Sequence, residues 1–186
     1  MRPPVVKGTG LRRRKDVRLS TGFALKSNVV LTSFPNWGAG RNAVRFEIDR
    51  AVGPFELCHC NRCRKVSGSA FMAGLDVRRD EFRLVAGREL IKSYEVPIIE
   101  SPPAYRVCFC RVCGSCVPDP DADSEWFEIP VGLLDDDPQL RPDKHIFVEL
   151  RAGWFQITDQ LPQFDKRALI KHREETAQQS VQPDRA

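Results

Sequence analysis

Three cysteines, Cys58, Cys60 and Cys63, lie within six residues in a C-x-C-x-x-C pattern. In an extended strand alternate side chains share a face, so Cys58 and Cys60 are expected to point the same way. A tight turn through Asn61 and Arg62 would then bring Cys63 toward them, as in zinc ribbons and knuckles. Three thiolates on one zinc leave a fourth position open, which is typical of catalytic zinc sites. The pattern therefore predicts zinc with an exchangeable fourth ligand.

His59 alternates with the predicted ligands. Strand parity places its side chain with Phe55 and Leu57, away from the sulfurs, so we expect a packed histidine that supports the site rather than a ligand. His145, Trp126 and Trp154 are likewise expected in core or supporting roles. Three buried hydrophobic thiols would not require this cysteine spacing. Disulfides would require an oxidising compartment, which nothing else in the sequence indicates.

A second cluster repeats the spacing at Cys108, Cys110 and Cys113, and Cys116 adds one more C-x-x-C step. Gly114 directly after Cys113 suits the tight turn of a zinc knuckle. Four thiolates could close a structural tetrahedral site here. Alternatively, only Cys110 and Cys113 bind metal, and Cys108 and Cys116 are packing thiols. Spacing does not separate the two interpretations.

Length and composition indicate one soluble globular domain. The chain has 186 residues, of which 41% are hydrophobic and 29% charged, values ordinary for a globular protein. The apolar runs are too short to span a bilayer, and no segment has the features of a secretory signal. Seven cysteines, all between Cys58 and Cys116, indicate reduced, metal-bound thiolates in a cytoplasmic protein.

The net charge of +4 is unevenly distributed. Residues 1–33 hold eight of the 29 Lys and Arg residues but one of the 25 acids, so this leader carries +7 and the remainder −3. A mildly acidic body argues against a globular surface built for nucleic acid, so nucleic acid is expected, if at all, only at the leader. We expect the leader to be mostly disordered. An organelle transit peptide and a nucleic-acid-binding arm are the alternatives.

Short apolar runs broken by turn residues follow the leader. Strands at this spacing predict an all-β sandwich or folded sheet assembly. Residues 166–176 have helical composition, and the end of the chain is expected to fray. The predicted division is therefore a leader (1–33), a zinc-binding β domain (34–165), and a helix with a frayed tail (166–186). The predicted strands are residues 44–48, 71–77, 82–85, 91–96, 105–110, 126–131, 145–150 and 154–157.

These motifs resemble the glutathione-dependent formaldehyde-activating enzyme family, which also includes centromere protein V. The resemblance covers roughly residues 36–165. It implies a largely β, zinc-bearing sandwich, in agreement with the predicted strands. The segments that carry it are residues 58–65, 67–71, 109–115, 132–136, 141–146, 154–155 and 159–164.

The resemblance also implies roles for both cysteine clusters. The first cluster would hold a zinc with an exchangeable site, and Cys110 with Cys113 would form half of a structural zinc site. The other half normally comes from a G-C-x-C-G-x-V-R motif, but the matching stretch here has Ala39 and Arg41 at the cysteine positions. Either Cys108 and Cys116 complete that site locally, or it is lost. One or two zinc ions per chain are therefore expected.

The activity implied is the joining of glutathione and formaldehyde into S-hydroxymethylglutathione, a carbon–sulfur lyase reaction in its reverse sense. Arg62, Arg64 and Lys65 could meet the carboxylates of glutathione, although a solvated basic turn is an equally good interpretation of each. Another thiol, or a similar small electrophile, would fit the same chemistry. The alternative is a non-catalytic, zinc-stabilised binding module of the centromere protein V type. The occupant of the fourth zinc position distinguishes the two.

Overall fold

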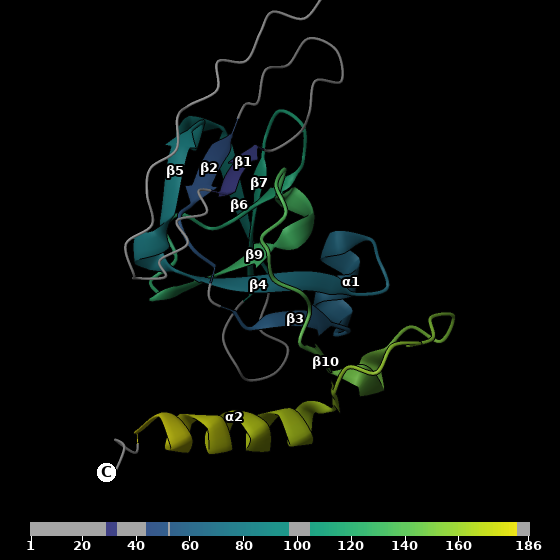
Figure 1. Cartoon of the computed structure of the whole chain (residues 1–186). Coiled ribbons are helices and arrows are strands. Elements are labelled where there is room, and N and C mark those ends of the chain that lie inside the picture. Colours follow the sequence, from purple (N-terminus) through teal and green to yellow (C-terminus); the bar gives the residue numbers. More distant parts are fainter. Residues whose placement is uncertain (1–28, 33–43, 52, 97–104, 182–186) are drawn as a thin grey trace, which may run out of the picture.

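The computed structural model describes residues 29–32, 44–51, 53–96 and 105–181 (Figure 1). Most of the predicted leader lies outside these residues. Strands predominate, and two α-helices accompany them, α1 (Asn61–Ser67) and α2 (Lys166–Val181). The mostly β fold class with a C-terminal helix is therefore confirmed. Among the described residues, no helix is long and apolar enough to cross a membrane.

Within the described residues the strands form three sheets. The first has the order β1 (Val29–Thr32), β2 (Arg45–Ile48), β5 (Phe82–Ala86). The central sheet has the order β11 (Gln163–Phe164), β10 (Lys144–Ile146), β3 (Phe55–Cys58), β4 (Met72–Arg78), β9 (Trp126–Pro130). The third has the order β6 (Ile91–Val96), β7 (Tyr105–Cys110), β8 (Cys116–Val117). Short 3₁₀ turns join some of these strands, at Arg79–Glu81, Arg88–Leu90, Val131–Leu133 and Val148–Leu150.

The main core lies between the first sheet and the central sheet. Side chains alternate along each strand, so one face of every strand can be apolar. From β2, Phe46 and Ile48 point inward, and they meet an apolar face built by β3, β4 and β9. The two sheets therefore pack face to face, as in the predicted β-sandwich. The apolar face of the central sheet consists of Phe55, Leu57, Leu75, Val77, Phe127 and Ile129.

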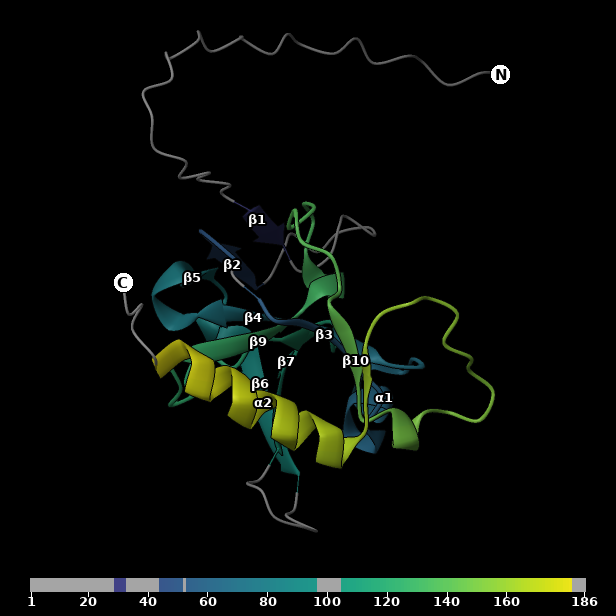
Figure 2. The ribbon, with the colours of Figure 1, turned by 60° about the horizontal axis from the view of Figure 1, so that its bottom comes forward.

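The opposite face of the central sheet is polar at its middle and carries the cysteine site at one end. Glu56, Asp76 and Glu128 alternate with the core residues along β3, β4 and β9. Helix α2 runs across the molecule on this side (Figure 2). Its Arg173 Nη2 lies 2.9 Å from Glu56 Oε2, and Leu169 is buried in a cluster with Cys58, Cys63, Met72 and Ile146.

Three local predictions differ from the structure. The strand expected at 145–150 ends at Ile146, because Phe147 has a φ of +57° and the chain then forms a 3₁₀ turn. Residues 154–157 form no strand. Helix α2 extends beyond the expected end at Thr176, to Val181.

A matched pair of valines tests the core assignment. Val77 on β4 is fully buried, whereas Val85 on β5 is 51% exposed. Val77→Ala removes two buried methyl groups and leaves a cavity, so we expect the free energy of unfolding to fall by about 2–3 kcal/mol. Val85→Ala should change it by about 0.5 kcal/mol or less. Urea denaturation of both variants measures the difference, and equal losses would contradict this core.

Candidate metal centre

The three cysteines of the first cluster converge where β3 meets α1. Cys58 is the last residue of β3, Cys60 caps the N-terminus of α1, and Cys63 lies in its first turn. Their Sγ atoms all lie within 4.8 Å of one another. Cys63 is brought there by the start of a helix rather than by the predicted tight turn. The cap is stabilised by the Cys63 N–H, which donates to Cys60 Sγ at 3.3 Å.

The three thiols affect one another's ionisation. S–H groups of Cys58 and Cys63 can donate to the Cys60 sulfur, and this lowers the pKa of Cys60. The same interaction with Cys60, together with burial, raises the pKa of Cys58. The pKa of Cys63 is raised by its neighbours Cys58 and Cys60 and by burial. A thiolate at Cys60 therefore makes the second and third ionisations unfavourable, because like charges repel.

A cation that neutralises these charges would remove the penalty. In tetrahedral coordination with Zn–S bonds of about 2.3 Å, the sulfurs lie about 3.8 Å apart, so sulfurs already within 4.8 Å need little movement. The donor set therefore fits zinc. Within the described parts of the chain, no other group of three or more His, Cys, Asp or Glu side chains converges in this way.

The site is closed on one side and open on the other. Cys58 and Cys63 are buried against Met72, Ile146 and Leu169, whereas Cys60 is partly exposed. A fourth ligand can therefore approach from solvent on the Cys60 side. The protein supplies three thiols there and leaves space for one more donor.

His59 points away from the sulfurs, as its strand parity predicted. It is fully buried, and its Nε2 lies 2.8 Å from Nδ1 of His145. His145 Nε2 in turn lies 3.0 Å from Asp159 Oδ2. The prediction of a packed, supporting His59 is confirmed, and so is a core position for His145. Trp126 and Trp154 are 40% and 75% exposed, so a core position is wrong for both, and a supporting role stays a prediction.

The chain Asp159–His145–His59 has a defined proton arrangement. A hydrogen bond from the backbone N–H of Leu161, and a second from His145, lower the pKa of Asp159, so its carboxylate accepts from His145 Nε2–H. When His145 Nε2–H donates to Asp159, its Nδ1 can accept from His59 Nε2–H. Burial, followed by His145, lowers the pKa of His59 and keeps it neutral. Nδ1 of His59 has no hydrogen-bond partner of normal geometry among the described residues. The Ala70 backbone opposes the decrease in the pKa of His59.

The basic residues of the first motif lie on α1, but not all in the same environment. Arg64 donates from Nη1 to the carbonyl oxygen of Leu150 at 2.6 Å, so it ties α1 to the loop after β10. Arg62 and Lys65 are exposed and, being three residues apart, share one face of the helix. Both side chains therefore lie on the surface of α1.

A comparison of the sequence with known families now bears on this geometry. The family described as glutathione-dependent formaldehyde-activating enzyme matches residues 41–150. The chain belongs to this family. The matched segment contains both cysteine clusters and most of the central sheet, so the resemblance seen in the motifs is confirmed.

Other comparisons add little to the family assignment. No curated protein matches the chain. Among solved structures, a Rhodobacter sphaeroides protein from a structural genomics programme is 21% identical, with 66% of this chain and 94% of that chain covered, at a TM-score of 0.38. A TM-score this low supports no conclusion here.

The second cluster is not gathered like the first. Cys108 and Cys110 on β7 are buried together with Val44 and Val117. Burial raises the pKa of Cys108 to about 11, which suits a neutral packing thiol. The strand register pairs Cys116 with Phe109. Residues directly paired across antiparallel strands share a face, so Cys116 belongs to the face opposite Cys108 and Cys110.

Cys113 is exposed in the turn between β7 and β8, with its Sγ 3.2 Å from Ser115 Oγ. The hydrogen bond with Ser115 lowers the pKa of Cys113, and contact with Cys110 contributes. The structure thus places Cys110 and Cys113 side by side in one turn. It does not bring Cys108 and Cys116 to them to form a closed set of four metal ligands. Ala39 and Arg41, which stand where this family normally has two further cysteines, lie outside the described residues.

Sequence reasoning missed two contributors to the site. Asp159 forms a hydrogen bond with His145 of the histidine pair, and Leu169 packs behind the thiols. Each is far from the cysteine motif in sequence, and no local spacing identifies it. The one available signal was for Asp159, which lies in a segment that carries the family resemblance.

Zinc affinity should depend steeply on pH. Cys58 and Cys63 hold protons near neutral pH because their pKa values are raised, and zinc binding must displace about two protons. As pH rises this competition weakens, so we expect the apparent affinity to increase by about two decades per pH unit. Chelator competition between pH 6.5 and 7.5 measures the slope. A slope near zero would show that the three thiols are already ionised.

His145 should be important for stability. His145→Ala leaves the buried His59 without its hydrogen-bond partner and opens a cavity, so we expect a loss of about 2–4 kcal/mol in the free energy of unfolding. His172 on α2 is the matched control, since it is only partly buried and stacks on Phe164. His172→Ala should cost about 1 kcal/mol or less. Thermal or urea unfolding of both variants provides the measurement, and equal costs would argue against the His59–His145 pair.

Proposed function

We propose that this protein is a zinc-dependent carbon–sulfur lyase that acts on the adduct of formaldehyde, or a similar small electrophile, with glutathione or another thiol. The observation that carries the proposal is the convergence of Cys58, Cys60 and Cys63 with one side open to solvent. Membership of the formaldehyde-activating family supports the substrate class. The cytoplasm, where thiols stay reduced, is the proposed location.

Cys58, Cys60 and Cys63 would hold the zinc. When bound, zinc supplies a site at which an incoming thiol loses its proton at neutral pH. The partly exposed position of Cys60 gives that thiol a way in, while Met72 and Leu169 close the opposite side to water. Arg62 and Lys65, on the exposed face of α1, would attract the carboxylates of glutathione. Arg64 would contribute through donors other than the one bonded to the Leu150 carbonyl oxygen.

The overall reaction balances without a redox partner. In the synthetic direction the thiol sulfur forms a bond with the formaldehyde carbon, the C=O π bond breaks, and the oxygen takes a proton to become a hydroxyl group. The thiol proton is released and one proton is taken up, so none is gained or lost overall. The thiolate is the nucleophile, and the protein must position it and provide the proton.

We place one zinc ion per chain, at the first cluster. Cys110 and Cys113 lie together, but the described residues supply no third or fourth ligand beside them. We propose that Cys108 and Cys116 have packing roles. Elemental analysis of reduced protein should therefore give about one zinc per chain. A value near two would show that the second cluster also binds metal.

A matched cysteine pair tests the function. Cys60→Ser removes a metal ligand. We therefore expect the variant to lose its zinc and the catalysed rate to fall by at least about 100-fold. Cys113→Ser makes the same chemical change at an exposed thiol outside the trio, and both zinc and rate should be retained. Because glutathione and formaldehyde also combine unaided, the rate is measured by exchange NMR at equilibrium with the uncatalysed exchange subtracted. A wild-type protein that binds zinc and glutathione without accelerating exchange would favour the binding-module alternative.

A further inference from the structure

The cysteine pair at the turn of the β7–β8 hairpin has no part in the proposed function. Cys110 ends β7, and Cys113 is the last residue of the turn that follows it. Ala39 and Arg41 occupy the sequence positions from which the family would supply two further cysteines. Among the described residues, no third His, Cys, Asp or Glu side chain joins the pair to form a metal site. The two thiols are therefore available for other chemistry.

Backbone hydrogen bonds fix the shape of this turn. The N–H of Gly114 donates to the carbonyl oxygen of Cys110 at 2.7 Å, which closes a single helical turn, and the N–H of Cys110 donates to the carbonyl oxygen of Ser115 at 2.8 Å. The N–H of Arg111 donates to the carbonyl oxygen of Leu90 at 2.8 Å. In helical geometry, Cα atoms three residues apart are separated by about 5 Å. A disulfide requires a Cα separation of about 4.4–6.8 Å, so this turn can form one without rearrangement.

The two cysteines differ in their access to solvent. Cys113 is exposed, whereas Cys110 is fully buried in a cluster with Val117. Ser115 Oγ lies 3.2 Å from Cys113 Sγ, where the hydroxyl group can donate to a thiolate and stabilise it. The Cys110 side chain contacts the same sulfur. A reagent from solvent therefore reaches Cys113 first, and Cys110 is placed to react with a group attached there.

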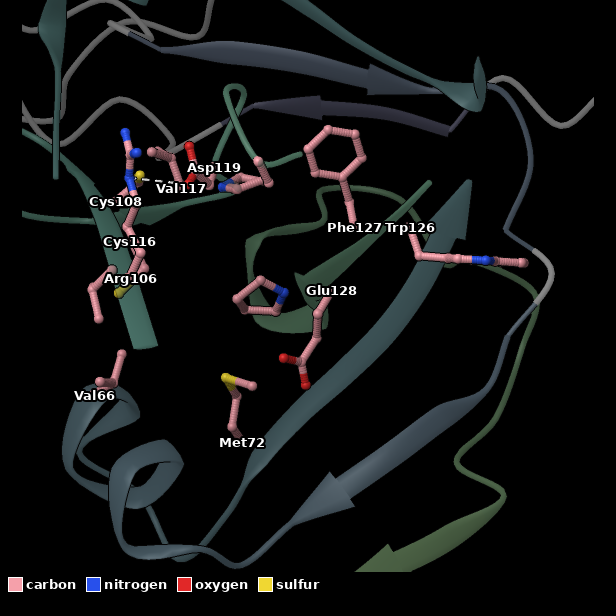
Figure 3. A pocket seen from close by; sticks show the side chains of 14 residues that line it. Val66, Met72, Arg106, Cys108, Cys116, Val117, Asp119, Trp126, Phe127 and Glu128 are labelled. Atoms are coloured by element: carbon pink, nitrogen blue, oxygen red, sulfur yellow. Dashed lines mark ion pairs between the residues drawn. The ribbon is translucent and has the colours of Figure 1, made fainter. Parts of the chain in front are cut away.

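The other two thiols of the hairpin lie elsewhere. Cys108 and Cys116 line a pocket between the hairpin and the central sheet (Figure 3), and Cys110 and Cys113 are not among the residues that line it. Arg106 and Asp119, which form an ion pair of 3.1 Å, belong to the same pocket. Cys116 is therefore a matched control, because it is a thiol of the same hairpin away from the turn.

We propose that Cys110 and Cys113 form a dithiol that exchanges reversibly with a small disulfide of the glutathione type. This inference does not depend on the lyase activity. The Cys113 thiolate attacks one sulfur of glutathione disulfide, its S–S bond breaks, and one glutathione leaves with the proton that Cys113 released. Cys110 then loses its proton and attacks the Cys113 sulfur, the mixed S–S bond breaks, and the second glutathione leaves with that proton. The two cysteines are oxidised by two electrons, and glutathione disulfide is reduced to two thiols.

Such a pair is compatible with a reducing compartment. Disulfides that occur there are usually transient rather than structural. Reduced glutathione reverses both steps, since each is an exchange between a thiolate and a disulfide. The ratio of glutathione to its disulfide would therefore set the fraction of chains that carry the Cys110–Cys113 disulfide.

The test treats the reduced, zinc-loaded full chain with glutathione disulfide. Arg111 lies between the two cysteines, so trypsin cleaves the chain there once the remaining thiols have been blocked and the protein unfolded. Only a disulfide then holds the two peptides together. Mass spectrometry should find joined peptides from the wild type, and separate peptides after excess reduced glutathione is added before blocking. Cys116→Ser should give the same two results.

Two further variants assign the steps. Cys113→Ser should form neither the glutathione adduct in this turn nor the joined peptides. Cys110→Ser should accumulate one glutathione on Cys113, because the thiol that displaces it is missing. Since Cys110 is buried, Cys110→Ala repeats this measurement with a side chain suited to an apolar site.

Three results would overturn the inference. One is a wild type that stays fully reduced, and another is joined peptides that persist in Cys113→Ser. The third is two zinc ions per chain with one lost in Cys113→Ser, since the pair would then be metal ligands. A wild type that stops at the Cys113 adduct would overturn the role of Cys110. None of these results depends on the exchange rate of glutathione with formaldehyde, so the proposed function stands or fails separately.

Discussion

Repulsion between three sulfurs at the end of one strand is the constraint on which the functional end of this protein depends. The fold brings the Sγ atoms of Cys58, Cys60 and Cys63 within 4.8 Å of one another. Without a cation, one thiolate is stabilised by its two protonated neighbours and by the N-terminus of α1. With a cation, all three can ionise. The protein thus provides a site that is poorly satisfied alone and well suited to a soft divalent metal.

The surrounding structure makes this convergence possible. Cys58 ends β3 and Cys60 caps α1, while His59 between them points the other way, where the buried His59–His145 pair fixes the segment to β10. On the sulfur side, Met72 and Leu169 exclude water. The site therefore combines a polar anchor on one face of the strand with an apolar backing on the other. Neither alone would set the direction of the open position.

Much of this arrangement could be predicted from sequence, because it depends on local periodicity. The alternation around Phe46 and the apolar run that ends at Val77 predicted two of the core strands, and the C-x-C-x-x-C spacing predicted the convergence of three thiols. Predictions failed where the cause was not local. The strand after His145 ends because Phe147 adopts a left-handed conformation, which apolar composition does not reveal. The position of Cys116 depends on the β7–β8 register, which only the folded chain creates.

The position of α2 has a thermodynamic consequence. Leu169 is buried in the same cluster as Cys58 and Cys63, so the helix and the ligands share one packing environment. Coupling between two such events is reciprocal. If docking of the helix strengthens metal binding by a given factor, metal binding strengthens docking by the same factor. The C-terminal helix thereby becomes an element through which anything that binds or displaces it changes how firmly the metal is held.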